Sequence, residues 1–186
     1  MADASPQFHV RLASSDGDDA ESILAAWDST LPFLASIGAG EMWGDQPFSQ
    51  RAGQRQEVID IINGTTKKFD GGRQFWIAEV HRAEEIVKVG AAMTREVLPG
   101  YLTKHVDMGS DSNTMEAILY LEVLIADHRF NRRYRGAGKA LVEALAQRAR
   151  SDGRNVIYVD VWAGNDRKLN TQVWPLAEAG TLLILE

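Results

Sequence analysis

The chain lacks cysteine altogether among its 186 residues, which removes several kinds of chemistry. Disulfide bonds, thiolate zinc sites, cysteine nucleophiles and acyl-cysteine intermediates all need a thiol. The sequence also lacks any run approaching the ~20 apolar residues of a membrane span, and its acidic, polar start is unlike a secretory signal. We therefore expect a cytoplasmic protein with no membrane partner, and we assign it no metal ligands.

Repeats and low-complexity segments are absent as well, and the composition is ordinary. Hydrophobic residues make up 45% of the chain and charged residues 25%, as in most globular proteins. A length of 186 residues is sufficient for one domain with a buried core and short for two. We expect a single domain over residues 1–186.

Positive charge is concentrated in one short stretch of an otherwise acidic chain. The net charge is −6, yet five basic residues fall within eleven positions that contain no Asp or Glu, which leaves the remainder at −11. These five are Arg129, Arg132, Arg133, Arg135 and Lys139. A nucleic-acid backbone would need an extended basic face. We therefore expect a small anionic ligand and no nucleic acid; the alternative is a solvated basic loop without a function.

The basic stretch lies between a strand and a helix. Residues 117–125 are almost wholly apolar and predict a buried strand, whereas residues 138–150 have the apolar spacing of an amphipathic helix. Unpaired N–H groups and the dipole at a helix start favour anions. Gly136 and Gly138 permit close approach to the backbone, and arginines suit phosphate. The sequence therefore predicts a phosphate-bearing cofactor at this turn.

Two well-known phosphate motifs fit the turn incompletely. A P-loop has glycine at the position of Arg133 and a hydroxyl residue at that of Ala140, so this motif is excluded. A dinucleotide fingerprint has a third glycine where Leu141 stands, although Asp160 lies near the expected distance for the ribose-binding acid. A nucleotide-binding, oxidoreductase-like domain is kept as an alternative.

A third pattern, Arg/Gln-x-x-Gly-x-Gly/Ala, is matched in full by residues 133–138. With the strand before this turn and the helix after it, the sequence resembles the GNAT superfamily of acyl-coenzyme A N-acyltransferases over about residues 8–165. The resemblance implies acetyl-coenzyme A as the cofactor, with its pyrophosphate on the turn. The residues so assigned are Arg133, Tyr134, Arg135, Gly136, Ala137, Gly138 and Lys139.

The resemblance assigns further cofactor contacts. It implies that the backbone of Val123, Leu124 and Ile125 pairs with the pantetheine arm, and that Asn165 contacts coenzyme A. One N–H group on this strand would point at the thioester carbonyl, where such a donor lowers the barrier by roughly 2.7–4 kcal/mol.

The expected elements give an α+β fold. In order, we expect a strand at 8–12, a helix from about residue 16 that Pro32 ends or kinks, a helix at 49–62, a hairpin of strands 73–80 and 86–93, the strand at 117–125, the helix at 138–150 and a strand at 156–162. A hairpin followed by a β-α-β unit indicates a mixed sheet. By resemblance, the sheet is GNAT-like and mostly antiparallel, flanked by helices and splayed at the cofactor site.

Glu122 is the candidate general base. It is the one carboxylate inside the apolar strand 117–125, and such a group must be ion-paired, protonated or at the edge of a cavity. Strand alternation places it on one face with Tyr120 and Leu124. The alternative is a structural salt bridge, for example to an arginine of the 129–135 loop. Asp160 is a second candidate base, and Asp127 and His128 lie where they could touch a substrate.

The tail departs from the family pattern. Gln172 stands where the family usually has the tyrosine that protonates the leaving thiolate, and the closing strands are missing or replaced. The resulting sheet edge suggests a possible homodimer. We expect an N-acetyltransferase in which a primary amine, of a small molecule or a peptide, attacks acetyl-coenzyme A directly in a ternary complex. The alternative is a non-catalytic or weakly active acyl-coenzyme A-binding protein.

Overall fold

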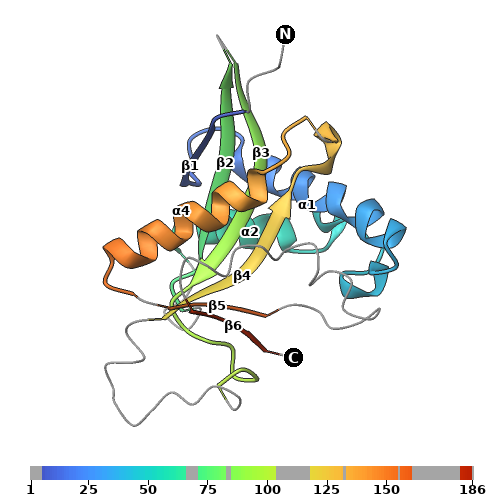
Figure 1. The fold of residues 1–186 in the computed structure, drawn as a ribbon. Coiled ribbons are helices and arrows are strands. Elements are labelled where there is room, and N and C mark those ends of the chain that lie inside the picture. Colours follow the sequence, from blue (N-terminus) through green and yellow to red (C-terminus); the bar gives the residue numbers. More distant parts are fainter. Residues whose placement is uncertain are drawn as a thin grey trace.

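The computed structural model describes residues 6–65, 71–82, 85–103, 118–131, 133–154 and 156–160, and the backbone of 181–185. Figure 1 shows the arrangement of its strands and helices. The strands are β1 Phe8–Leu12, β2 Gln74–Arg82, β3 Glu85–Arg95, β4 Ile118–Ala126, β5 Val156–Asp160 and β6 Thr181–Leu185. The α-helices are α1 Asp19–Ser36, α2 Gln54–Ile62 and α4 Ala137–Ser151, with 3-10 turns at Gly40–Met42, Phe48–Gln50 and His128–Phe130.

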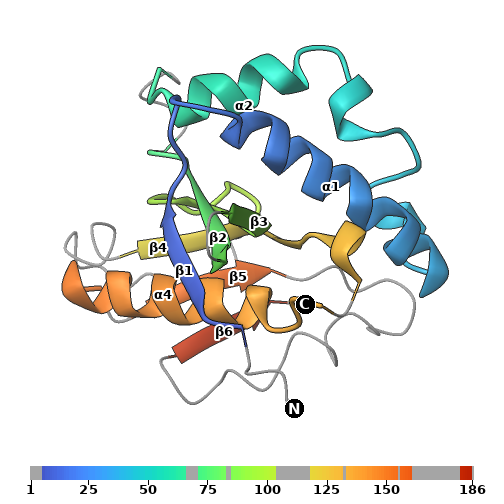
Figure 2. The ribbon, with the colours of Figure 1, turned by 90° about the horizontal axis from the view of Figure 1, so that it is seen from above.

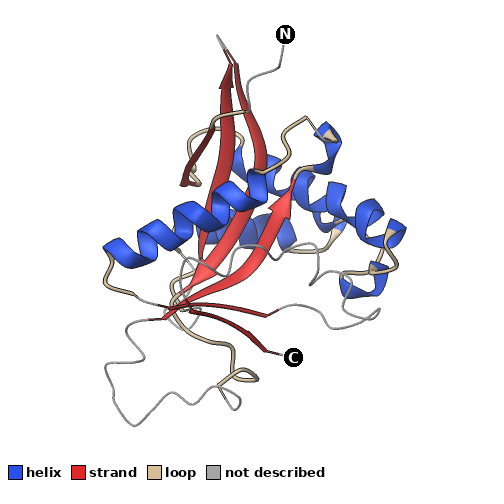
Figure 3. Ribbon diagram, viewed as in Figure 1, coloured by secondary structure: helices blue, strands red, loops and turns tan. Residues whose placement is uncertain are grey.

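One sheet organises the chain, with its strands in the order β1-β2-β3-β4-β5-β6. The three pairings from β1 to β4 are antiparallel, and those of β5 with β4 and with β6 are parallel. Helices α1 and α2 cover one face, and α4 crosses the other (Figure 2). Figure 3 shows the strands between these two helical layers. The predicted α+β fold with a mixed, mostly antiparallel sheet is confirmed.

The helices pack as their apolar spacing predicts. Leu141, Leu145 and Ala149 recur every fourth residue along α4 and are at most 2% exposed against β2, β3 and β4. On the opposite face, Ile23 and Trp27 of α1 pack with the core residues of α2. Two separate cores therefore lie on the two sides of one sheet.

Strand β4 continues past its described pairing with β5. The parallel pairing joins residues 118–121 to residues 156–159, whereas β4 runs to Ala126 and the described part of β5 ends at Asp160. The splay at the cofactor site that the family resemblance implies stays a prediction.

Several boundaries differ from the sequence prediction. Helix α1 runs through Pro32 to Ser36, because Leu31 and Leu34 are buried on either side of the proline and their packing offsets the lost backbone bond. Helix α2 begins at Gln54, after Gly53 in a left-handed conformation, and not at Ser49. Strand β6 pairs with the outer edge of β5, where the sequence led us to expect an uncovered edge.

A buried carboxylate joins α1 to β1 and β3. The Asp19 side chain is 1% exposed and lies 2.7 Å from Arg11 Nη1 and 2.6 Å from Lys88 Nζ, and it accepts a 2.8 Å bond from the Ser14 N–H. Burial raises the pKa of Asp19, but the bonds from Arg11, Lys88 and Ser14 outweigh it and hold the pKa well below its ordinary value. The ionised form therefore stabilises the folded state.

The Asp19→Asn variant is expected to lose about 2–3 kcal/mol of unfolding free energy at pH 7, because the half-buried Arg11 and Lys88 lose their one shared buried counter-charge, while the amide oxygen still accepts a bond. The stability supplied by a carboxylate with a depressed folded pKa is present above its unfolded pKa and is lost as the pH falls. The difference between parent and variant should therefore shrink below about pH 4, as measured by urea unfolding over a pH series.

A matched control is available on the same helix. Glu21 pairs with Arg55, but these side chains are 49% and 61% exposed, so Glu21→Gln should cost less than about 1 kcal/mol. Equal losses in the two variants would contradict the role assigned to Asp19.

Among the residues that the structure describes, no helix is long and apolar enough to cross a membrane.

Candidate functional site

The turn into α4 lies beside β4, past the last described pair of β4 with β5. A methyl group built on Gly138 would be 3.9 Å from Leu124 Cδ2, which is ordinary contact distance. The fold thus brings together two groups of residues that the sequence assigned separately, namely the phosphate turn and the pantetheine-binding part of the strand.

Gly136 shapes the turn. Its φ of 108° is in the left-handed region that other residues rarely adopt, and Phe8 Cε2 lies 3.3 Å from the position of a Cβ there. No side chain caps this end of α4, and the helix ladder begins with the 2.9 Å bond from Ala140 N–H to the Gly136 carbonyl. The Ala137 N–H donates a 3.4 Å bond back to the Tyr134 carbonyl, so the N–H groups of Gly138 and Lys139 are the ones directed at the space in front of the helix.

The side chains of the turn divide into buried and exposed members. Tyr134 and Ala137 are 6% and 2% exposed and belong to the core under α4, so they can offer a ligand little besides their backbone. Arg133, Arg135 and Lys139 are exposed. The Arg133 guanidinium lies 5.5 Å from the Tyr134 ring centre, which holds this cation close to the turn. Positive charge and unpaired N–H groups therefore occur at the same place.

Beyond Leu121, one edge of β4 has no partner among the strands that the structure describes. The Asp127 N–H donates a 2.9 Å bond to the Val89 carbonyl, so by alternation Ile125 and Val123 direct their backbone groups at β3. Leu124 therefore directs its N–H and carbonyl to the other side, where β5 as described has already ended. Of the three residues assigned to pantetheine, Leu124 is the one whose backbone groups are placed to pair with a ligand.

A β-bulge lies at the candidate base. Met93 pairs with Val123 and Thr94 pairs with Leu121, so Glu122 is the extra residue on β4. The bulge shifts, by one residue, the alternation of side chains between the two faces of the sheet. Val123 therefore packs on the α1 side while Leu124 packs on the α4 side. The prediction that Leu124 shares a face with Tyr120 and Glu122 is wrong for this reason.

Glu122 is held by two arginines. Its carboxylate accepts bonds from Arg73 Nε at 3.1 Å and Arg73 Nη2 at 2.8 Å, and Arg95 Nε lies 3.4 Å away. The side chain is 20% exposed and so retains a solvent-facing part. The salt bridge that was considered as the alternative role of Glu122 is therefore present. Its arginines are Arg73, which precedes β2, and Arg95, which ends β3, and neither comes from the 129–135 loop.

Asp160 is bonded by two tyrosines. The Tyr101 hydroxyl donates a 2.8 Å bond to Asp160 Oδ2, the Tyr120 hydroxyl donates to Oδ1, and the two hydroxyls are 3.3 Å apart. Burial and the bond to Asp160 raise the pKa of Tyr120 far above its usual value, so it stays a neutral donor. Arg95 lies over the Tyr120 ring at 5.2 Å and connects this cluster to Glu122. The carboxylates of β4 and β5 therefore share one polar region.

The residues at the end of β4 contact α1. Asp127 is 5% exposed, accepts a 3.0 Å bond from the Arg129 N–H and caps the short turn that follows. His128 stacks on Phe33 with ring centres 4.2 Å apart, and its N–H donates to Ser29 Oγ at 2.9 Å. Burial lowers the pKa of His128. His128 thus fixes the strand end to α1, and Asp127 holds the turn that follows.

Sequence reasoning missed four residues of this region, which are Arg73, Arg95, Tyr101 and the Tyr120 hydroxyl. The shared face of Tyr120 and Glu122 was the one signal available, since the others come from distant segments. Asn165 and Gln172 lie outside the described residues.

Comparisons with known proteins bear on the fold. No protein-family model matches the sequence, and no curated protein is significantly similar to it. Among solved structures, a protein assigned to the GNAT acetyltransferases from Desulfovibrio desulfuricans has 12% identity and a TM-score of 0.53, covering 89% of this chain and 80% of its own. AAC(6')-Iy, in complex with the bisubstrate analogue CoA-S-monomethyl-acetylneamine, has 15% identity and a TM-score of 0.50, covering 97% of both chains.

A transcriptional regulator from Bacillus halodurans is similar to the same degree, with 16% identity and a TM-score of 0.50, covering 97% of this chain and 100% of its own. At identities this low a structural likeness shows the fold. The GNAT-like fold expected from residues 133–138 is therefore confirmed. The chain has the fold of the GNAT acetyltransferases.

Proposed function

We propose that the protein is an N-acetyltransferase that transfers an acetyl group from acetyl-coenzyme A to a primary amine. The observation that carries this proposal is the closeness of Gly138 to the Leu124 side chain, which brings the uncapped start of α4 next to β4 beyond its last described pair with β5. The likeness to AAC(6')-Iy, whose structure holds an analogue joining coenzyme A to an acceptor, supports the same reading.

The cofactor contacts follow from this geometry. The backbone of residues 133–139 and the exposed cations of that turn would hold the pyrophosphate. The backbone of residues 123–125 would pair with the pantetheine arm, mainly through Leu124, and Asn165 stays a predicted contact. The bulge leaves backbone groups around Glu122 outside the ladder with β3, and one such N–H is our candidate donor to the thioester carbonyl oxygen.

The transfer would occur in one step within a ternary complex. The amine nitrogen attacks the carbonyl carbon, the new C–N bond forms, the C–S bond breaks and the sulfur leaves as a thiolate. Glu122 would accept the proton of the amine, directly or through water. The chain has no cysteine that could carry the acetyl group in between.

The acceptor is proposed to be a cationic amine of a small molecule or a peptide. The net charge of −6 favours the approach of cations, and the carboxylates of Glu122 and Asp160 lie in one polar region. No nucleic-acid partner, a possible homodimer, a single domain and a cytoplasmic location stay predictions. The second candidate function is acyl-coenzyme A binding without transfer, which the arginine pairing of Glu122 favours.

Release of coenzyme A tests the proposal. A thiol reagent reports the product without background from the protein, because the chain contains no cysteine. Acetyl-coenzyme A is supplied with a panel of polyamines, aminoglycosides and lysine peptides, and we expect thiol release that depends on one class of amine.

The outcomes separate the candidates. Binding of coenzyme A without amine-dependent release would support the non-catalytic alternative. Stabilisation by NAD and not by coenzyme A, in a thermal shift at matched ligand excess, would support the nucleotide-binding alternative; a ligand at 100 times its dissociation constant adds about 2.7 kcal/mol.

A further inference from the structure

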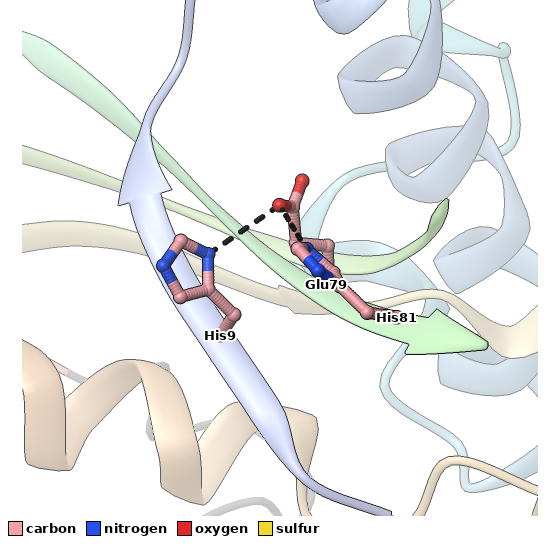
Figure 4. Close-up of side chains that lie close together, drawn as sticks. All are labelled: His9, Glu79 and His81. Atoms are coloured by element: carbon pink, nitrogen blue, oxygen red, sulfur yellow. Dashed lines mark hydrogen bonds and ion pairs between the residues drawn. The ribbon is translucent and has the colours of Figure 1, made fainter. Parts of the chain in front are cut away.

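Two histidines flank a buried carboxylate on the α1 side of the sheet. Figure 4 shows His9 of β1 and His81 of β2 directed toward Glu79. His9 lies directly across from Glu79 in the β1–β2 ladder, and His81 follows Glu79 by two residues on the same face of β2. The pairing of β1 with β2 therefore creates this cluster from residues about 70 positions apart.

The three side chains converge on a common point. His9 Nδ1 is 3.4 Å and His81 Nε2 is 2.8 Å from Glu79 Oε1, and all three atoms lie within 4.8 Å of one another. Zinc binds His nitrogen and carboxylate oxygen at about 2.0–2.1 Å with tetrahedral geometry, which places neighbouring ligand atoms roughly 3.3 Å apart. The two separations from Glu79 Oε1 lie on either side of this value.

The second oxygen of the carboxylate is already occupied. Arg11 Nε donates a 2.9 Å bond to Glu79 Oε2, and Asp19 in turn holds the Arg11 guanidinium with bonds of 2.7 and 3.1 Å. Glu79 is 3% exposed, so its orientation is fixed by these bonds and by packing. Support of a ligand by an outer hydrogen bond is typical of metal sites. Oε1 is the oxygen left to face both imidazoles.

We propose that His9 Nδ1, Glu79 Oε1 and His81 Nε2 bind a divalent cation of the zinc class. Two imidazoles and one carboxylate suit Zn²⁺ and its transition-metal neighbours better than Mg²⁺ or Ca²⁺. The histidine side chains are 62% and 56% exposed, so an ion can enter from solvent and keep a water as its fourth ligand. This site was not predicted from the sequence, because no two of its ligands form a recognised spacing.

The ion would join an edge strand to the rest of the sheet. β1 pairs with β2 alone, and Phe8, next to His9 but on the opposite face, contacts the Gly136 turn. A metal at His9 would therefore stabilise the strand that supports the start of α4. The proposal itself does not depend on the acetyltransferase function, since the cluster lies on the other side of the sheet from that turn.

Calorimetric titration of Zn²⁺ into tag-free, chelator-treated protein tests the site. We expect one ion per chain and a melting temperature that rises with zinc concentration. His9→Ala and His81→Ala should each weaken binding by on the order of 10–100-fold or more. Both side chains are more than half exposed, so the variants should fold like the parent. Co²⁺ substitution should give the intense visible absorption of a tetrahedral site in the parent and not in the variants.

His128→Gln is the matched control, because this histidine stacks on Phe33 and is not part of the cluster. It should leave zinc affinity unchanged. Glu79→Gln is a less useful variant, since the loss of a buried partner of Arg11 affects folding as well. Failure of the parent to bind Zn²⁺ at millimolar concentration would overturn the proposal, as would unchanged affinity in both histidine variants.

Discussion

The Gly138→Asp variant is expected to bind coenzyme A roughly a thousandfold more weakly than the parent. The new carboxylate would stand in the first turn of α4, in front of which we place the pyrophosphate. Two like charges about 4 Å apart near a protein surface repel by about 4 kcal/mol, which corresponds to roughly a thousandfold in the dissociation constant. Isothermal titration with coenzyme A measures the effect.

The fold should tolerate this change. An acidic residue in the first turn of a helix is favourable, and the loss of a helical glycine removes an entropic cost. A Cβ at this position makes an ordinary 3.9 Å contact with Leu124. Gly136 is a poorer position for such a test, because its φ of 108° strains any other residue.

Gly138→Ala is the matched control, since it adds the Cβ without the charge. It should bind coenzyme A nearly as well as the parent. If the aspartate variant also bound with parental affinity, the pyrophosphate would have to lie elsewhere and the proposed cofactor site would be wrong.

The Glu122→Gln variant is expected to transfer the acetyl group about 10²–10⁴ times more slowly, which is the usual contribution of a general base. Glutamine has nearly the same shape and keeps an oxygen for Arg73, but it cannot take a proton from the amine. Affinity for coenzyme A should be unchanged, because Glu122 lies on the face of β4 that is turned away from α4. The measurement is kcat at saturating acetyl-coenzyme A and amine.

Glu57→Gln controls for the loss of a carboxylate beside Arg73. Glu57 Oε1 lies 3.2 Å from Arg73 Nη1, but this side chain belongs to α2 and is 49% exposed. The control should keep its kcat and lose less than about 1 kcal/mol of stability. A Glu122→Gln protein with a lower melting temperature and the parental kcat would identify Glu122 as a structural partner of Arg73 and Arg95.

Local patterns in the sequence predicted much of the fold. The order of strands and helices, the buried positions Leu141 and Leu145 of α4, and the turn at Gly136 follow from spacing and from the conformational freedom of glycine. Whether Pro32 ends or kinks α1 was left open, because the burial of Leu31 and Leu34 on either side of it is a tertiary effect that helix propensity does not include.

The candidate site was harder to predict from the sequence than the fold. The bulge at Glu122 depends on how β3 and β4 align, and nothing in the strand sequence indicates an extra residue. The partners of Glu122 and Asp160 come from positions 73, 95 and 101, which the fold brings close to β4 and β5. The same holds for His9 and Glu79, whose contact requires the β1–β2 register. Such contacts depend on the pairing of segments that are distant in the sequence, and this pairing cannot be derived from a single sequence.

The tyrosine bonds to Asp160 have a consequence for how ligands are received. They attach the last described residue of β5 to β4 right beside the final paired position, Leu121 with Val159. Side chains of the protein itself therefore fix the spacing of the two strands at Asp160. Polar groups held in this way before a ligand arrives are preorganised, so little conformational entropy is lost when a ligand binds beside them.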